Sequence, residues 1–433
     1  MASTDDIKHL LRRAEFTARP NRISALTPLT IAQAVDNVLD TAQNGATPLP
    51  PNLANIEDEG SWEDYVNAYN WWVDSMVSRP RPILEKMTLF WHGHFVSSVD
   101  DVYVVHMIQQ NQLYRDYALG NFLTLTQKMA LEPAMLLYLS NAVNYKKSPN
   151  ENFARELLEL FTLGVGNYTQ DDVFAAARAW TGHNYNWELE AYVFNPKQHD
   201  TGLKTFFGTT KNWDGPDIIN EILRDNAGKR LIAAKYIAKK LWEFFAYPGP
   251  AQVIVDDLAN EFIANNLEIK PLLRALFNRS EFYTTAAKQG LVRTPTDFVV
   301  DILYRTGLKA DDLGLSWSMG YTGQQLFSPP NVAGWKSNSY WINTSSLSGR
   351  AGIARSVIWQ VFQDGAFDAV DDMTVEQAVD HIAQYFGLDL SSVTRTALIN
   401  TLRAERQSTP WGSWQATPNL LTMMMCSPEM SMA

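Results

Sequence analysis

The sequence predicts a mainly α-helical protein, and three observations support this fold class. Hydrophobic residues make up 46% of its 433 residues, which is enough for a large buried core. Apolar residues recur at spacings of three and four along most of the chain, as on the buried face of a helix. Ser and Pro stand where such helices would begin. We therefore expect a large multi-helix globular body, interrupted by a short β-hairpin and loop around 182–213 and by a long ordered loop around 319–344.

The helix starts can be followed along the chain. Ser3 with Asp6 and Ser61 with Asp64 have the spacing of a capping box, in which each side chain bonds the other residue's backbone N–H. Proline stands at or near the start of several later helices, where a missing N–H is harmless. Beyond these two capped helices, we expect helices over 82–91, 101–118, 121–130, 133–140, 150–163, 170–180, 215–225, 229–246, 251–265, 270–278, 295–306, 345–363, 374–386, 391–405 and 416–426.

Two stretches depart from the helical period. Residues 182–213 alternate apolar and polar side chains around Trp187, which predicts the hairpin and its loop. Residues 319–344 are rich in Gly, Pro, Asn and aromatic side chains, and an ordered loop of this length is more often functional than not. No linker divides the rest of the chain cleanly. We expect one helical unit over 1–433, with 182–213 as the place where a sub-division would fall.

Charge and cysteine content exclude several classes of protein. With 36 Lys and Arg against 47 Asp and Glu, the net charge is −11, which argues against a nucleic-acid partner. Cys426 is the only cysteine, so neither an intramolecular disulfide nor a cysteine-based metal cluster can form. No apolar run approaches the ~20 residues that span a bilayer. The N-terminus lacks the pattern of a signal peptide, so we expect a cytoplasmic protein or an exported one whose leader has been removed.

A first candidate site is the pair His92 and His94, which flank Gly93. On a helix, side chains two residues apart point roughly 200° apart, whereas on an extended segment they face the same side. Gly93 follows the expected 82–91 helix and favours the extended geometry. His92 and His94 are therefore candidate ligands of one metal ion, although such a pair alone is weak evidence.

A second candidate site is the charged face of NENFARELLEL. Asn152, Glu156 and Glu159 share one side of the expected helix, and Arg155 is spaced to pair with Glu151 or Glu159. One interpretation is a solvated face of ion pairs. Because the chain is otherwise poor in charge, a buried network or a catalytic site explains the cluster at least as well. We take Arg155, Glu156 and Glu159 as candidate catalytic residues and Asn152 as a candidate substrate contact.

The two predicted loops supply the remaining candidates. His199 and Asp200 are candidate catalytic residues and Lys204 a candidate substrate contact, because metal ligands and proton carriers gather on loops. The alternative is an ordinary turn with an incidental histidine. In the second loop, Asn331, Trp335 and Trp341 offer hydrogen bonds and stacking faces for a substrate, or else form a rigid plug that closes the helical body.

These blocks resemble the bacterial proteins of the family known as domain of unknown function 1800. The resemblance spans most of the chain and is carried by EKMTLFWHGHFVSS, PNENFARELLELFTLGVGNYTQDDV, ARAWTGH, HDTGLKTFFG and LFSPPNVAGW. It implies a large helical fold. Members are often encoded beside a sulfatase-like family, many of whose proteins carry twin-arginine export leaders. The resemblance thus implies a sulfatase-like partner and work on a polymer at or beyond the cell envelope.

Our leading hypothesis is a metal-assisted hydrolase that acts on a polymer or carbohydrate. One divalent ion (Zn, Mn or Fe) would activate water and would be held by His92, His94, Glu156 and His199. A metal-free version uses Glu156 and Glu159 as acid and base, tuned by Arg155. The alternative is a non-enzymatic carbohydrate-binding or assembly protein, in which the same charged residues form a structural salt-bridge network.

Overall fold

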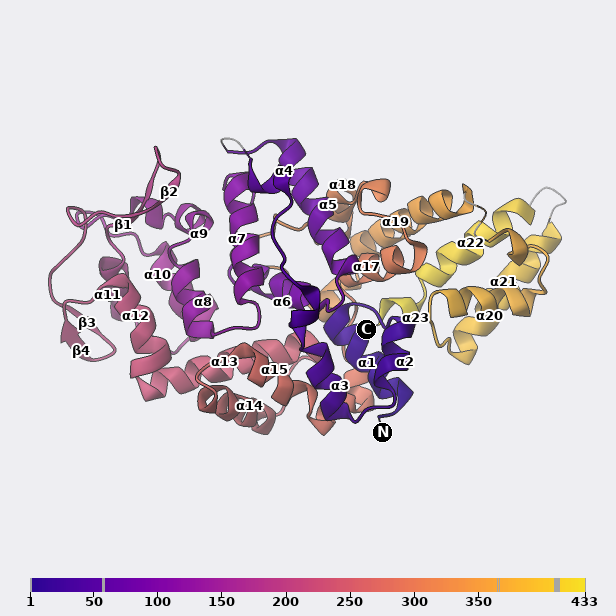
Figure 1. Cartoon of the computed structure of the whole chain (residues 1–433), viewed down its shortest axis with the longest axis horizontal. Coiled ribbons are helices and arrows are strands. Elements are labelled where there is room, and N and C mark those ends of the chain that lie inside the picture. Colours follow the sequence, from indigo (N-terminus) through magenta and orange to yellow (C-terminus); the bar gives the residue numbers. More distant parts are fainter. Residues whose placement is uncertain (1, 57–58, 364, 366, 409–412, 433) are drawn as a thin grey trace.

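The helices of the computed structural model begin largely where the sequence places their caps (Figure 1). The structure describes residues 2–56, 59–363, 365, 367–408 and 413–432. α5 (Trp62–Ser78) starts with the full capping box: the Asp64 N–H donates to Ser61 Oγ at 3.2 Å, and the Ser61 N–H donates to Asp64 Oδ2 at 2.8 Å. Ser3 caps α1 (Thr4–Glu15) by accepting from the Asp6 N–H at 3.0 Å. The predicted mainly helical fold class is confirmed.

The first half of the chain is helical up to residue 179, and η denotes its 3₁₀ or π turns. The segment η3 is a π-helix that continues directly from α10. The other elements of this half are α2 (Pro20–Leu26), α3 (Ile31–Val38), η1 (Thr41–Asn44), α4 (Pro51–Ala54), α6 (Ile83–His92), α7 (Val104–Tyr117), α8 (Phe122–Met129), α9 (Pro133–Tyr138), η2 (Asn141–Val143), α10 (Asn152–Glu156), η3 (Leu157–Thr162) and α11 (Gln170–Ala179).

Two antiparallel hairpins occupy the predicted interruption, where one was expected. β1 (His183–Asn186) pairs with β2 (Ala191–Phe194), so that His183 lies opposite Phe194. β3 (Lys204–Phe206) pairs with β4 (Thr209–Lys211). Both hairpins lie at the left end of the molecule in Figure 1, beside α9 to α12.

The second half is helical again, and the predicted 319–344 loop contains only two 3₁₀ turns, η7 and η8. Its elements are α12 (Gly215–Asn220), η4 (Glu221–Asp225), α13 (Ala227–Phe245), α14 (Gln252–Ala264), α15 (Ile269–Phe277), η5 (Ser280–Tyr283), α16 (Thr285–Lys288), α17 (Pro295–Thr306), η6 (Asp311–Leu313), α18 (Leu315–Ser318), η7 (Met319–Thr322), η8 (Asn338–Trp341), α19 (Thr344–Gln363), η9 (Asp368–Val370), α20 (Val375–Tyr385), α21 (Ser392–Ser408), α22 (Ser413–Met425) and α23 (Pro428–Ser431).

The buried apolar side chains form two large clusters that share helices. One cluster is built on α1, α3, α6 and α13 to α15, and the other on α5, α17 and α19 to α22. Phe90 belongs to the first and its neighbour Leu89 to the second, so α6 packs into both. The chain's end returns to the middle of the elongated molecule, where the Arg293 N–H donates to the Ser431 carbonyl at 2.8 Å (Figure 1).

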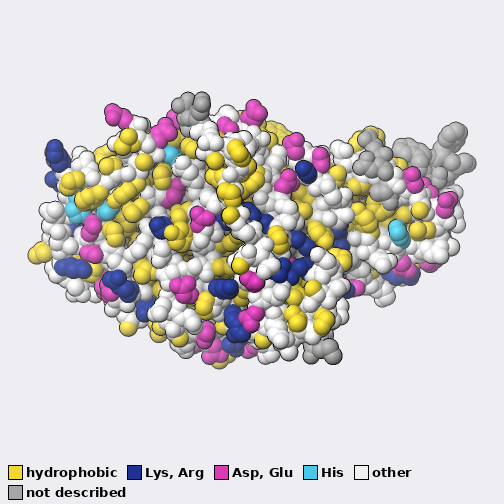
Figure 2. All heavy atoms as spheres, viewed as in Figure 1, with side chains coloured by type: hydrophobic (Ala, Val, Ile, Leu, Met, Phe, Trp, Pro, Cys, Tyr) yellow, Lys and Arg dark blue, Asp and Glu magenta, His cyan; other side chains and the backbone are white. Residues whose placement is uncertain are grey.

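The surface carries mixed charge. On the face drawn in Figure 2, acidic and basic side chains are interspersed with apolar ones, and Lys and Arg gather near its centre. Among the described helices, none has both the length and the apolar character that crossing a membrane requires.

Candidate functional site

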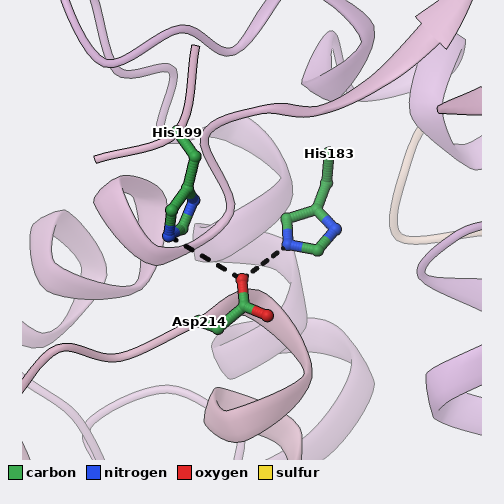
Figure 3. A group of neighbouring side chains, drawn as sticks. All are labelled: His183, His199 and Asp214. Carbon is green, nitrogen blue, oxygen red and sulfur yellow. Dashed lines mark hydrogen bonds and ion pairs between the residues drawn. The ribbon is translucent and has the colours of Figure 1, made fainter. Parts of the chain in front are cut away.

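His183, His199 and Asp214 converge at the hairpin end of the molecule (Figure 3). His183 opens β1, His199 lies on the loop between the two hairpins, and Asp214 precedes α12. His183 Nε2 lies 2.8 Å and His199 Nε2 lies 4.0 Å from Asp214 Oδ1. Within the described ranges, this is the only group of three or more His, Cys, Asp or Glu whose ligand atoms come close enough to share a metal ion, all within 4.8 Å of one another.

His199 is held by its other ring nitrogen. Its Nδ1 lies 2.8 Å from the Thr181 carbonyl oxygen, which can only accept, so Nδ1 carries a hydrogen and the ring turns Nε2 towards Asp214. The backbone at residue 182 packs so closely against Asn195 and His199 that glycine is required at this position. Gly182 has a φ of +79°, and a Cβ there would lie 2.7 Å from the Asn195 carbonyl oxygen and 2.9 Å from the His199 amide nitrogen.

His183 is held in a similar way across the hairpin. Its Nδ1 lies 3.0 Å from the Tyr192 hydroxyl, and its Nε2 donates to the ionised Asp214 carboxylate at 2.8 Å. A metal ion at Nε2 would replace that hydrogen, and the Tyr192 hydroxyl could then accept the hydrogen on Nδ1. The ring also packs at 5.0 Å from Trp180 and at 4.9 Å from Phe194. Both imidazoles are therefore buried and fixed in orientation.

Asp214 is the most exposed of the three residues. Its side chain is 46% exposed, whereas those of His183 and His199 are 3% and 8% exposed. Burial alone raises the pKa of this carboxyl, but the hydrogen bond and charge of His183 outweigh it, so the pKa of Asp214 is lowered and it is ionised at neutral pH. Two imidazoles and one carboxylate form a ligand set for Zn²⁺ or Fe²⁺.

Of the residues predicted around His199, Asp200 and Lys204 support the loops that carry the group. Asp200 pairs with Arg178 Nε at 2.7 Å. Lys204 Nζ donates to the carbonyl oxygens of Asp200 at 2.5 Å and Trp213 at 2.9 Å, so it joins the segment after His199 to the segment before Asp214. Burial is the main cause of the lowered pKa of Lys204. Catalytic and substrate roles for these two residues stay predictions.

The extended geometry predicted for His92 and His94 is wrong. α6 continues through His92, and Gly93 caps it in right-handed helical conformation (φ −84°, ψ −7°). His92 Nε2 accepts from the Phe327 N–H at 3.1 Å, whereas His94 Nε2 donates to the Phe161 carbonyl at 3.0 Å. The two rings are thus committed to different partners.

The predicted ligand set is not assembled. Neither His92, His94 nor Glu156 belongs to the group that contains His199, and no second such group occurs in the described part of the chain. Burial lowers the pKa of His92 to about 3, so its ring is neutral and acts as a hydrogen-bond acceptor for the loop at Phe327. The His-Gly-His pattern alone favours an extended segment, whereas packing in the folded protein continues α6 through His92. This continuation of the helix explains why the predicted ligand set does not form.

The charged face of α10 is partly solvated. Arg155 pairs with Glu151 at 2.8 Å, and their side chains are 37% and 31% exposed. Arg155 also donates to Gln170 Oε1 at 3.0 Å. Asn152 is exposed at the first position of this helix. This pairing agrees with the interpretation of ion pairs one helical turn apart.

The two glutamates that follow, Glu156 and Glu159, form no ion pair with Arg155 in the described structure. Glu156 is half-buried, and burial followed by the charge of Glu159 raises its pKa. Glu159 accepts a hydrogen bond from the Tyr168 hydroxyl. Their roles as acid and base, like that of Arg155, stay predictions.

The 326–335 segment packs directly on the turn after α6. Gly334 has a φ of +77°, and a Cβ there would lie 2.5 Å from the Gly93 carbonyl oxygen. Asn331 is exposed, and its Oδ1 accepts from the Ala333 N–H at 2.9 Å to form a local turn. The half-buried Trp335 lies with its ring 5.3 Å from that of His92.

A cleft of about 190 Å³ brings together three of the predicted residues, His94, Trp335 and Trp341. Lys240 and Phe244 of α13 line its other side. Because His94 donates through Nε2, its Nδ1 is an acceptor, and this buried atom has no hydrogen-bond partner among the described residues. Burial lowers the pKa of Lys240 to about 8. The cleft thus combines aromatic side chains with two polar ones, those of His94 and Lys240, and His199 does not line it.

Two of the three residues that converge in Figure 3, His183 and Asp214, are absent from the sequence-based candidates. His183 reads as an isolated histidine, and Asp214 stands in no motif. One signal was present, because His183 ends the ARAWTGH block.

The model of the family described as Protein of unknown function (DUF1800) matches residues 9–432. No curated protein and no solved structure matches the chain. The family match includes both hairpins, α12 and the segment that lines the cleft.

Proposed function

We propose that this chain, which belongs to the DUF1800 family of proteins of unknown function, is a metal-dependent hydrolase whose divalent ion is held by His183, His199 and Asp214. The observation that carries the proposal is the common direction of three ligand atoms: two Nε2 atoms and one carboxylate oxygen from three separate segments. A structural hydrogen bond between His183 and Asp214 needs neither the third residue nor the backbone contact that orients the His199 ring.

The surroundings of the group also suit a ligand-binding metal. Each imidazole has its Nδ1 within hydrogen-bonding distance of an oxygen, the arrangement that orients metal-ligating histidines in proteins. Three protein ligands leave at least one position for water or substrate, as in catalytic rather than structural zinc sites. When bound, such an ion lowers the pKa of water and polarises a substrate oxygen, which is the chemistry of hydrolysis.

Apolar side chains next to the group supply a surface for the substrate. Phe194 is 40% exposed, and its ring lies 4.9 Å from His183 and 5.4 Å from His199. Trp187, in the turn at the opposite end of the same hairpin from His183, is 58% exposed. Exposed aromatic rings such as that of Phe194 are suited to the apolar faces of sugars, so a carbohydrate or other polymer is the substrate class we propose.

A non-enzymatic carbohydrate-binding or assembly protein is the second candidate. The observation that favours it is the ion pairing of the region, in which Asp200 with Arg178 and Arg155 with Glu151 resemble a stabilising network. In that case the 2.8 Å contact between His183 and Asp214 would hold β1 against α12 and bind no metal.

Metal binding separates the two. Protein purified without a histidine tag would be titrated with Zn²⁺, Mn²⁺ and Fe²⁺ by calorimetry, and bound metal counted by elemental analysis. We expect one ion per chain, loss of binding in His199→Gln, and no change in His381→Gln, whose histidine is exposed on α20 outside the group. Absence of binding, or equal binding by both variants, would overturn the metal site.

Hydrolysis is tested separately on the metal-loaded protein. Release of reducing ends from a panel of polysaccharides should appear with metal, vanish with EDTA and be missing in His199→Gln. One bound ion without hydrolysis of any polymer in the panel would contradict the enzyme and favour a binding protein.

A further inference from the structure

A small cavity lies beside the cleft that Trp335 and Trp341 line, which we call the aromatic cleft, and cationic side chains form part of the cavity wall. Its volume is about 40 Å³, and Arg12 and Arg13 of α1 and Lys86 of α6 form part of its wall. A cavity of this size holds roughly three waters, or one small oxyanion. It is a different region from the proposed metal site, and neither hairpin contributes to its lining.

Arg13 is buried in the wall of this cavity without a full set of partners. The residue is 3% exposed, and its Nη2 donates to the Ala287 carbonyl at 2.6 Å. Its Nε and Nη1 find no hydrogen-bond acceptor among the described residues. A buried charge left with unpaired donors is strongly unfavourable. Burial lowers the pKa of Arg13 to about 9, in keeping with a missing anion.

The carboxylates around Arg13 are already occupied. Asp297 pairs with Lys86, and Asp301 pairs with Arg293 at 2.7 Å and Arg305 at 2.9 Å. Glu243, which lines the cavity, lies 3.9 Å from Lys239 and accepts from the Gly249 N–H at 3.2 Å.

A second buried guanidinium, that of Arg350, also lacks hydrogen-bond acceptors for two of its nitrogens among the described residues. Arg350 is 2% exposed, and its Nη2 donates to the Arg293 carbonyl at 2.5 Å, but its Nε and Nη1 have no partner in the described structure. Among the described residues, six cations of this region (Arg12, Arg13, Lys86, Arg293, Arg305 and Arg350) outnumber its three carboxylates (Glu243, Asp297 and Asp301). The region thus has an excess of positive charge.

We propose that this cavity binds an oxyanion group (phosphate, sulfate or carboxylate) through an unpaired N–H donor of Arg13, with Lys86 and Arg12 adding positive charge. A hydrogen bond from a guanidinium to an anionic oxygen is charge-assisted and stronger than one between neutral groups. Glu243, Phe244, Thr294 and Ser337 line both this cavity and the aromatic cleft. The ligand therefore places its anionic end at Arg13 and its body against Trp335 and Trp341.

The test measures anion binding by the full chain. Melting temperature and calorimetry would be followed with potassium phosphate, sulfate and acetate at constant pH and ionic strength, with chloride as the reference. We expect a saturable rise in melting temperature with at least one oxyanion and none with chloride. The anion that binds most tightly identifies a tetrahedral or a planar group.

Arg13→Lys keeps the charge but removes the unpaired guanidinium donors, so we expect an affinity about tenfold weaker or lower still. If that variant does not fold, Arg12→Gln, which changes a half-buried side chain of the same cavity, should weaken binding in the same direction. Arg395→Gln removes an exposed arginine that pairs with Asp380 at 2.7 Å, and it should bind as the unmodified chain does. No saturable shift with any of the three anions, or a shift that the Arg13 and Arg12 variants keep in full, would overturn the proposal.

Discussion

His199 Nδ1 donates to the Thr181 carbonyl at 2.8 Å, and this contact turns the opposite nitrogen towards Asp214, 4.0 Å away. Thr181 and His199 belong to segments that flank the first hairpin, so the ring orientation depends on how that hairpin closes. A ligand atom oriented in this way by backbone is a feature that proteins use at metal sites.

Gly182→Ala should displace His199 and destabilise the protein. The left-handed conformation costs an alanine roughly 1–2 kcal/mol, and its Cβ would also overlap the Asn195 carbonyl and the His199 amide. Gly208→Ala is the control, because Gly208 has the same φ of +79° with nothing within 4 Å of the added Cβ. We expect urea unfolding to show a loss about 1–3 kcal/mol larger for Gly182→Ala. Equal losses would show that the approach at Gly182 is not tight.

Phe194→Ala should weaken substrate binding and leave the metal in place. Phe194 lies beside both histidines but supplies no metal ligand, so the variant should bind one ion per chain while its KM for the hydrolysed polymer rises several-fold. Trp359→Ala removes a 67% exposed aromatic side chain on α19 and should leave KM unchanged. A KM unaffected by Phe194→Ala would exclude this ring from the substrate surface.

Glu85→Gln should be strongly destabilising, because it removes the charge that neutralises a buried arginine. Glu85 accepts from Arg115 Nε and Nη2, both at 2.9 Å, and from Trp72 Nε1 at 3.0 Å. Leaving Arg115 uncompensated should lower the free energy of unfolding by about 3–5 kcal/mol. Asp380→Asn breaks an exposed pair with Arg395 and should cost less than about 1 kcal/mol. Chemical denaturation of the two variants measures the difference, which comparable losses would contradict.

Glu132 should make stability fall as the pH rises. Burial raises its pKa from 4.5 to about 8, so the folded protein keeps this proton while the unfolded chain releases it above pH 4.5. Between these two values the free energy of unfolding should lose about 1.4 kcal/mol per pH unit from this group.

Glu132→Gln resembles the protonated acid and can still accept from the Ala134 N–H and from Gln110. Between pH 5 and pH 8, the urea midpoint of this variant should therefore fall less steeply with pH than that of the unmodified protein. The variant should be the more stable of the two at pH 8. Parallel pH profiles for the two proteins would refute the raised pKa.

Local patterns in the sequence were sufficient for the helices but not for the site. The Ser61–Asp64 spacing predicted the start of α5, and the alternation near Trp187 predicted a hairpin, because capping and strand periodicity act over a few residues. The end of α6 differs, since burial of Trp91 and His92 extends the helix to His92. Asp214 reaches His183 because the start of α12 packs against Trp180, where a Cβ on Gly215 would lie 2.5 Å from the ring, and no local pattern encodes this contact.

Anomalous diffraction from crystals grown with Zn²⁺ would locate the bound ion itself. We predict a zinc peak at about 2.0–2.2 Å from His183 Nε2, His199 Nε2 and one carboxylate oxygen of Asp214. A map with no peak at these three residues, while they keep the His183–Asp214 contact of 2.8 Å, would contradict it.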